Sequence, residues 1–356
     1  WQSSIVTAAT HTASAGQGLW LDTSSNGITL TLPASPSVGD QVIFTDYARN
    51  WGTNAVTLNL NSEKFQGNTT PVPVYDTTGE SVDIVYSGST KGWIPNTDGA
   101  VAMETPQNYN IDYLIVAGGG GSGSARSGGG AGAGGAGGYR TGSSVSITGG
   151  QTYAITVGAG GALGAGTSGA NQGGDGGASS IIGTGVSVTS AGGGGGGAGL
   201  GGSGAIGRDG GSGGGGGANA GPSGLPFAGG SGNVPSTSPV QGYDGGTTTS
   251  GSGYGSGGGG SSNSAPDGGG NPAAGGPGTS NSITGSAVTY AAGGVAGNGQ
   301  PGTAGGANTG DGANGSGQAY SGSAGGSGVV ILKVLTSDYT GTTTGSPTVT
   351  TDGSHK

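Results

Sequence analysis

Glycine constrains this chain more than any other residue. Ten of its 96 glycines precede Gly118 and three follow Gly328, which leaves 83 between those two positions. An α-helix of this composition would lose about 1 kcal/mol for each glycine relative to alanine, and a strand would lack side chains to pack. The tract is therefore either disordered or folded by backbone packing on backbone. It carries three Arg, five Asp and no Lys or Glu, whereas disordered segments are typically rich in charge. We predict an ordered domain.

Sterics predict the form of this domain. A chain without Cβ atoms readily adopts the polyproline-II helix, which has three residues per turn and no internal hydrogen bonds. The N–H and C=O groups then need partners on neighbouring helices, and glycine permits the close approach. Runs such as 192–197 and 213–217 break the Gly-X-Y register of collagen. We therefore expect several short helices folded back into a bundle.

Residues 1–103 have a different composition and show period-two alternation. The sequence predicts short strands and no helix. The predicted strands are Gly18–Leu21, Ile28–Leu32, Gln41–Thr45, Val56–Leu60, Val72–Tyr75, Ser81–Tyr86 and Trp93–Ile94. This spacing is typical of a small all-β sandwich or barrel. Its aromatic residues are expected to form the core or subunit contacts: Trp20, Phe44, Trp51, Tyr86 and Trp93.

The remaining boundaries follow from composition. Residues 104–110 read as a polar linker, and 111–335 as the glycine-rich domain. Strands are expected where this domain begins, at Ile111–Ala117, and where it ends, at Gly328–Val334. Shorter strands are expected inside it, at Thr152–Val157, Gly185–Thr189 and Ala287–Tyr290. The Thr-rich residues 336–356 resemble a linker to a further β module, and the start at Trp1 suggests a processed or partial chain.

Two stretches resemble known families. ITLTLPASPSVGDQVIFTDYARNWGTNAVTLNLN followed by SVDIVYSGSTKGWIPN resembles a β module of bacteriophage tail fibres, over most of residues 18–96. DYLIVAGGGG, GGAGGYRTG, TYAITVGAGG and SGVVILKV resemble the glycine-rich domain of phage tail fibres and adhesins, over roughly 111–335. A related arrangement occurs in a family of animal receptor kinases. The first resemblance implies a homotrimeric, structural shaft module; the second implies polyglycine-type helices on a β framework.

Charge and motifs exclude several functions. The net charge of −9 and the scattered basic residues disfavour nucleic acid, and the absence of cysteine removes disulfides and thiolate sites. The most apolar run, Val329–Leu335, is too short to span a membrane. No lysine follows a glycine, so a P-loop is excluded. The two histidines, His11 and His355, offer neither a metal pair nor a convincing catalytic triad.

The acidic residues can be interpreted as structural, as calcium ligands or as catalytic carboxylates. All five aspartates of the tract precede glycine, and we interpret these pairs as tight turns with positive φ at the glycine, with calcium binding as the alternative. They are Asp175, Asp209, Asp244, Asp267 and Asp311. In the β module, Glu63, Asp76, Glu80 and Asp83 could suggest glycoside hydrolysis, but the solvated face of a sheet explains them more simply. We expect no enzyme activity, catalytic residue, metal or cofactor.

The segment Pro222–Tyr254 has neither polyglycine runs nor clear strands. An irregular loop with aromatic residues on a rigid scaffold is how binding loops are often built, and a cap over the end of the bundle is the alternative. We expect a receptor site formed by Phe227, Tyr243, Asp244 and Tyr254, with Arg208 and Asp209 from a nearby glycine block.

The resemblance to tail-fibre modules implies an extracellular virion protein, a tail-fibre segment that we expect to attach to a host receptor. The receptor is expected to be a cell-surface glycan or an outer-membrane protein, and self-association is expected to give a homotrimer. Nucleic-acid binding and membrane insertion are not expected. The alternatives are a structural shaft or filament subunit without receptor contacts and, third, a surface-polysaccharide depolymerase.

Overall fold

The structure is a computed structural model, and it describes most of the chain. The described residues are 1–100, 108–126, 128–149, 151–166, 171–199, 205–218, 226–249, 253–268, 273–297, 299–339, 341 and 343–356. The chain divides into two compact units, Trp1–Thr105 and Pro106–Lys356. Within the described residues the only helical element is a single 3₁₀ turn, η1 (Thr336–Asp338), so nothing there could cross a membrane as a helix.

The first unit contains two β-sheets. One has the strand order β1 (Ile5–Val6), β3 (Gln17–Leu21), β5 (Gln41–Asp46), β8 (Glu80–Tyr86) and β9 (Trp93–Ala100). The other has the order β2 (Thr10–Thr12), β4 (Ile28–Thr31), β6 (Val56–Asn59) and β7 (Val74–Tyr75). The chain alternates between the sheets as it winds from β1 to β6, so consecutive strands within each sheet pair in parallel.

Alternation along these strands builds one core between the two sheets. Leu19 and Leu21 of β3 are buried, as are Ile28 and Leu30 of β4. The aromatic side chains of Phe44, Trp51, Tyr86 and Trp93 also lie in this core. This confirms the predicted all-β module. Trp20 lies on the opposite face of β3 and is only half-buried, so it does not contribute to the core.

The acidic residues of this unit do not share one face. β8 alternates strictly, so Glu80 is buried at 6% exposure while Asp83 points outward. Asp83 accepts a 2.8 Å hydrogen bond from the Gln41 side chain, and Glu63 accepts one of 2.7 Å from the Tyr86 hydroxyl. The expectation of a common solvated face is therefore wrong for Glu80, because its register directs it into the core.

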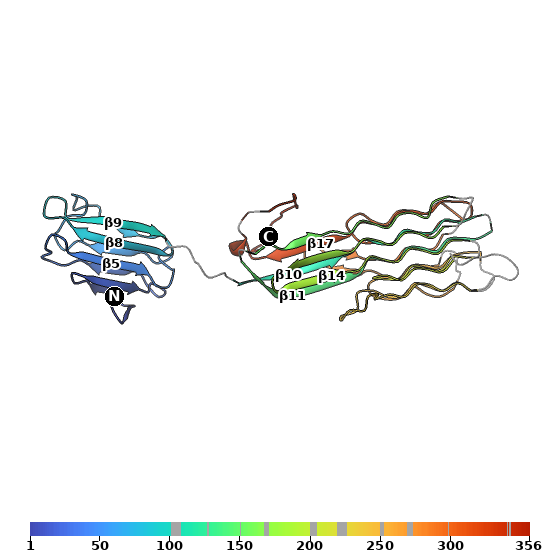
Figure 1. Cartoon of the computed structure of the whole chain (residues 1–356), viewed down its shortest axis with the longest axis horizontal. Coiled ribbons are helices and arrows are strands. Elements are labelled where there is room, and N and C mark those ends of the chain that lie inside the picture. Colours follow the sequence, from blue (N-terminus) through green and yellow to red (C-terminus); the bar gives the residue numbers. More distant parts are fainter. Residues whose placement is uncertain are drawn as a thin grey trace. The chain divides into compact units, whose positions relative to one another are not determined.

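The second unit carries its strands at one end, and glycine-rich segments extend from them side by side (Figure 1). One sheet has the order β11 (Tyr139–Thr148), β10 (Asn108–Val116) and β17 (Val329–Val334). The others are β12 (Ala154–Thr156), β13 (Ser179–Gly183) and β14 (Val186–Ser190), and the pair β15 (Thr279–Asn281) and β16 (Val288–Tyr290). The strands predicted at the two ends of the domain, β10 and β17, pair with each other, Val116 opposite Val329.

The glycine-rich segments have the threefold repeat of polyproline-II helices, and we call them glycine helices. In the glycine helix 117–125, every N–H donates to another segment, and every third donor reaches the same neighbour. The donors Gly118, Gly121 and Ser124 reach segment 171–177; Gly119, Ser122 and Ala125 reach 320–326; Ala117, Gly120 and Gly123 reach 132–138. The fold class predicted for this domain is thereby confirmed.

Carbonyl groups of the same glycine helix accept from three further neighbours. Gly118, Gly121 and Ser124 accept from 193–199, Gly119 and Ser122 from 161–164, and Gly120 from Ala313. Helix 117–125 therefore lies at the centre of six others. The buried backbone groups find their partners between helices, since the helix itself supplies none.

Such packing requires glycine at the contact positions. A Cβ placed on Gly194 would overlap the carbonyl oxygen of Arg208, and one on Gly215 would overlap that of Ser256. Among the described residues of the second unit, the largest apolar side chain buried away from the strands is alanine, as at Ala131 and Ala313. Backbone contact thus replaces side-chain contact throughout the bundle.

The C-terminal segment turns back on β17. Val334 and Lys356 exchange two backbone hydrogen bonds of 3.0 and 2.9 Å, and Lys333 forms a 3.0 Å ion pair with Asp352. The residues interpreted from sequence as an outgoing linker are thus partly docked on the glycine-rich unit.

Candidate functional site

The segment expected to be an irregular loop is largely part of the bundle. Within Pro222–Tyr254, residues 222–225 and 250–252 lie outside the described residues. Segments 226–232 and 241–249 are glycine helices: Gly245 donates to Gly230, and Gly213 donates to Tyr243. The loop prediction is wrong for both segments, because spaced glycines suffice for this packing without long glycine runs.

Among the described residues of this segment, only 233–240 form a loop, and side chains close it. Asn233 Oδ1 accepts from the N–H of Thr237 at 3.0 Å and from that of Gln241 at 3.3 Å. The fully buried Gln241 donates to the Pro235 carbonyl and accepts from the Ala191 N–H, both at 2.8 Å. This loop is held at both ends, as expected of a cap.

A polar groove of about 320 Å³ lies beside this loop-connected pair of helices. It is lined by helices 226–232 and 241–249 and by the segment 264–268. At Gly230 and Gly245 the backbone itself forms the surface of the groove, between polar side chains. Its lining side chains are Ser231, Asp244, Thr247, Ser264, Ala265 and Asp267. The groove lies where Gly229, Gly230 and Gly245 supply no side chain.

The two carboxylates in the groove are held by backbone N–H groups. Asp244 Oδ1 accepts from Gly232 at 2.7 Å, and Asp267 Oδ1 accepts from Thr247 at 2.8 Å. Within the described part of the chain, the second oxygen of each has no hydrogen-bond partner. Each carboxylate is thus oriented by one oxygen and available through the other.

Of the predicted receptor residues, only Asp244 lines the groove. Tyr243 precedes it and is 37% exposed, whereas Phe227 and Tyr254 are half-buried. The N–H of Phe227 donates to Thr248 Oγ1 at 2.8 Å, which ties this residue into the bundle. The structure therefore does not gather the three aromatic residues around Asp244.

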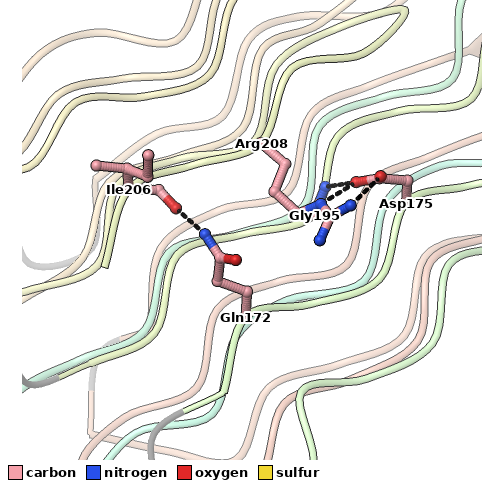
Figure 2. A network of polar contacts seen from close by, with 5 residues as sticks. All are labelled: Gln172, Asp175, Gly195, Ile206 and Arg208. Carbon is pink, nitrogen blue, oxygen red and sulfur yellow. Dashed lines mark hydrogen bonds and ion pairs between the residues drawn. The ribbon is translucent and has the colours of Figure 1, made fainter. Parts of the chain in front are cut away.

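Arg208 and Asp209 have structural partners. Arg208 forms a bidentate ion pair with Asp175, at 2.7 and 2.6 Å, and Asp175 also accepts from the Gly195 N–H at 3.0 Å (Figure 2). The Asp175 hydrogen bond and charge raise the pKa of Arg208. Asp209 accepts from the Ser231 N–H at 2.6 Å. These two residues join neighbouring helices and lie outside the groove lining.

Gln172 extends this network by one helical turn. Its side-chain amide donates to the Ile206 carbonyl at 2.7 Å (Figure 2). Residues 172 and 175 are three apart, so the threefold helix places both side chains on one face, toward the segment that carries Ile206 and Arg208. Polar side chains thus join the segments that carry Gln172, Asp175, Gly195, Ile206 and Arg208.

The Asp-Gly pairs have the same role, and their interpretation as turns was wrong at four of five positions. Of the five glycines that follow, only Gly268 has a positive φ, of 116°. Every one of the five carboxylates instead accepts a backbone N–H from another segment. The donors are Gly195 for Asp175, Ser231 for Asp209, Gly232 for Asp244, Thr247 for Asp267 and Ala292 for Asp311.

The aspartates accept these N–H groups because helices at the rim of the bundle have N–H groups without a neighbouring carbonyl. The aspartate side chain is long enough to supply the acceptor.

Sequence reasoning missed Asp267, Ser231, Thr247 and Ser264 as groove residues. The recurrence of Asp-Gly was the available signal, but it was attributed to turns. Within the described residues, no group of three or more His, Cys, Asp or Glu is placed to hold a metal.

Comparison with known proteins bears on the second unit. A search of curated proteins finds no match. The family model described as "Glycine-rich domain" matches residues 96–335, about two thirds of the chain. This chain is therefore a member of the glycine-rich domain family.

Proposed function

We propose that this chain is a segment of a bacteriophage tail fibre that attaches the virion to its host cell. The resemblance of residues 18–96 to a tail-fibre module and the family of the second unit support this proposal. In it, the protein acts outside the cell, binds a surface receptor and catalyses no reaction. The receptor is a glycan or an outer-membrane protein.

The groove carries the attachment part of the proposal. The bundle exposes few functional side chains, yet here Asp244, Asp267 and three hydroxyl groups gather around one concavity, with the exposed Tyr243 adjacent. Binding residues are commonly placed on a rigid scaffold. A structural shaft without receptor contacts is the competing function, and the closed loop 233–240 favours it.

Cell binding by the full chain tests the proposal. We expect labelled protein to bind candidate host cells and the double variant Tyr243→Ala, Asp244→Asn to lose this binding while its unfolding temperature stays within a few degrees. Tyr320→Ala is the matched control, because Tyr320 is also exposed, at 39%, and does not line the groove.

The alternatives predict other results. A shaft protein binds no cells in any form, and a depolymerase removes surface polysaccharide. If the double variant binds as well as the wild type, the receptor site lies elsewhere on the chain.

The proposal includes a homotrimer formed through residues 1–103. Three aromatic residues lie outside the core and contact one another: ring centroids are 4.3 Å apart for Trp1 and Trp20, and 6.4 Å for Trp20 and Tyr47. Trp1 and Tyr47 are 61% and 51% exposed. Aromatic residues are enriched at interfaces, so this surface is suited to a subunit contact.

Light scattering tests the homotrimer and should give a mass three times that of the chain. A stable monomer at micromolar concentration would contradict this.

A further inference from the structure

The groove contains a defined set of hydrogen-bonding groups. Two carboxylate oxygens, one each from Asp244 and Asp267, remain after their bonds to backbone N–H groups. The hydroxyls of Ser231, Thr247 and Ser264 make no side-chain hydrogen bond within the described residues. A hydroxyl both donates and accepts, whereas an ionised carboxylate only accepts.

A backbone donor completes this set. Gly229 lies three residues before Gly232, so its N–H points to the same side of the helix, toward the groove. The Gly232 N–H is bound by Asp244, whereas that of Gly229 has no partner among the described residues. The groove thus offers strong acceptors, one fixed donor and three adaptable hydroxyls.

The same inventory excludes two ligand classes. Among the described lining residues, Ala265 carries the only apolar side chain, so an apolar ligand would gain little buried area from them. None of the lining residues that the structure describes is a lysine, arginine or histidine, so an anionic ligand would meet two carboxylates without a compensating positive charge. The groove is large enough for a small ligand. A ligand rich in hydroxyl groups satisfies donors and acceptors together.

We propose that the groove at Asp244 and Asp267 binds a saccharide that carries no anionic group, either neutral or an amino sugar. Sugar hydroxyl or ammonium groups donate to the two carboxylates, and ring or hydroxyl oxygens accept from Gly229 and the Ser and Thr hydroxyls. As the receptor class of the attachment site, this inference rests on the proposed function.

Saccharide binding by the full chain tests the inference. A glycan panel with neutral, amino and acidic members serves as the probe, followed by calorimetric titration of a glucosamine trimer, an N-acetylglucosamine trimer and a trigalacturonate. We expect binding from the neutral and amino classes, with acidic members at least tenfold weaker. The double variant Asp244→Asn, Asp267→Asn should bind the glucosamine trimer at least tenfold more weakly than the wild type does. The ratio of its affinities for the glucosamine trimer and trigalacturonate should also be smaller.

Two further variants separate binding from folding. Asp311→Asn is the matched control, since Asp311 also precedes glycine and also accepts a backbone N–H, at 2.9 Å, but lies outside the groove. It should bind as the wild type does. Thr247→Val removes a hydroxyl that makes no hydrogen bond to another described residue, so it should weaken saccharide binding without loss of stability.

Several results would overturn the inference: no panel member bound, acidic glycans preferred, or an affinity unchanged in the Asn double variant and in Thr247→Val. Capture of a basic peptide or a second copy instead of a glycan would also overturn it. Cell attachment without glycan binding refutes only the inference, whereas glycan binding without attachment refutes only the proposed function.

Discussion

The two units of this chain exclude water from their peptide groups in opposite ways. The first uses sheets and a core of large side chains, with Phe44, Trp51 and Trp93 fully buried. In the bundle of the second, helices contact one another through backbone atoms, and buried apolar side chains are no larger than alanine. Among the described residues of the second unit, larger buried apolar side chains occur in its strands, as at Ile115 and Ile181.

This difference determines where each unit tolerates substitution. A side-chain core loses stability when an atom group is removed, because a cavity remains. A backbone-packed core loses stability when an atom group is added, because a carbonyl occupies the space. Opposite changes should therefore damage the two units, and each should unfold without the other.

The largest effect is expected from Gly194→Val. Its Cβ would overlap the Arg208 carbonyl, so the two helices must separate and lose their hydrogen bonds. We expect a loss of at least about 4 kcal/mol, enough to unfold the glycine-rich unit. Gly215→Val should act in the same way. Calorimetry of the full chain should show the transition of the first unit unchanged.

Ala159→Val adds a similar volume at an exposed position of the bundle and serves as the control. Native stability in Gly194→Val, or random-coil NMR shifts at 205–218 in the wild type, would contradict backbone packing.

The next largest effect is expected from Trp51→Ala. Removal of this fully buried ring should cost the first unit about 3–5 kcal/mol, through lost burial and the remaining cavity. Thermal unfolding should show only the first unit's transition lowered. Val38→Ala, at 76% exposure, should leave both transitions unchanged. A shift of both transitions in Trp51→Ala would show that the units unfold together.

Glu80 should make the first unit pH-dependent. Burial, a hydrogen bond with Asp98 and the negative charges of Asp98 and Asp76 raise the pKa of Glu80 from 4.5 to about 7. Because the folded pKa exceeds the unfolded one, the protonated form is favoured in the folded state. Its stabilisation is complete below pH 4.5 and is lost as the pH rises through about 7, by at most about 3 kcal/mol.

Glu80→Gln mimics the protonated carboxyl and should remove this loss. Denaturant unfolding at pH 5 and pH 8 measures it. Asp83→Asn, on the outward face of the same strand, is the control and should keep the wild-type dependence. If the wild type and Glu80→Gln lose the same stability between pH 5 and pH 8, ionisation of Glu80 is not the cause of the pH dependence.

The smallest effects are expected at the rim of the bundle. Arg208→Ala should cost less than about 1 kcal/mol, because both partners of its ion pair are substantially exposed. Asp175→Ala should cost about 1–2 kcal/mol, since it also leaves the Gly195 N–H without an acceptor. Asp175→Asn retains an acceptor for the Gly195 N–H, so its cost in unfolding free energy should lie between those of Arg208→Ala and Asp175→Ala. Equal costs for the Arg208 and Asp175 variants would show that the carboxylate acts only through its charge.

Much of the fold could be predicted from local patterns. Period-two alternation located β4, β5, β6 and β8 to within one or two residues, because side chains on alternate faces record which face is buried. β1, β2, β11, β13 and β15 were missed. For β11, the preceding glycine helix and Gly142 obscure the strand pattern. Its pairing with β10 is long-range and is not visible in the local sequence.

The candidate site was much less predictable. Asp244 was selected for its place near aromatic residues, yet its groove partners Asp267 and Ser264 lie on a later segment. Which residues share a groove depends on the lateral order of glycine helices, and a threefold helix gives each residue several candidate neighbours. No residue pattern along the chain encodes that order.

By itself, the sequence determined that residues 118–328 must fold through backbone contact, because so much glycine leaves neither helix propensity nor side-chain packing. It also determined that strands would bound this domain. The tertiary structure alone decided which N–H groups at the rim lack a carbonyl, and therefore that the Asp-Gly pairs cap neighbouring helices. Local turn chemistry allows both roles for aspartate, and only the position of a helix twelve to twenty-two residues away distinguishes them.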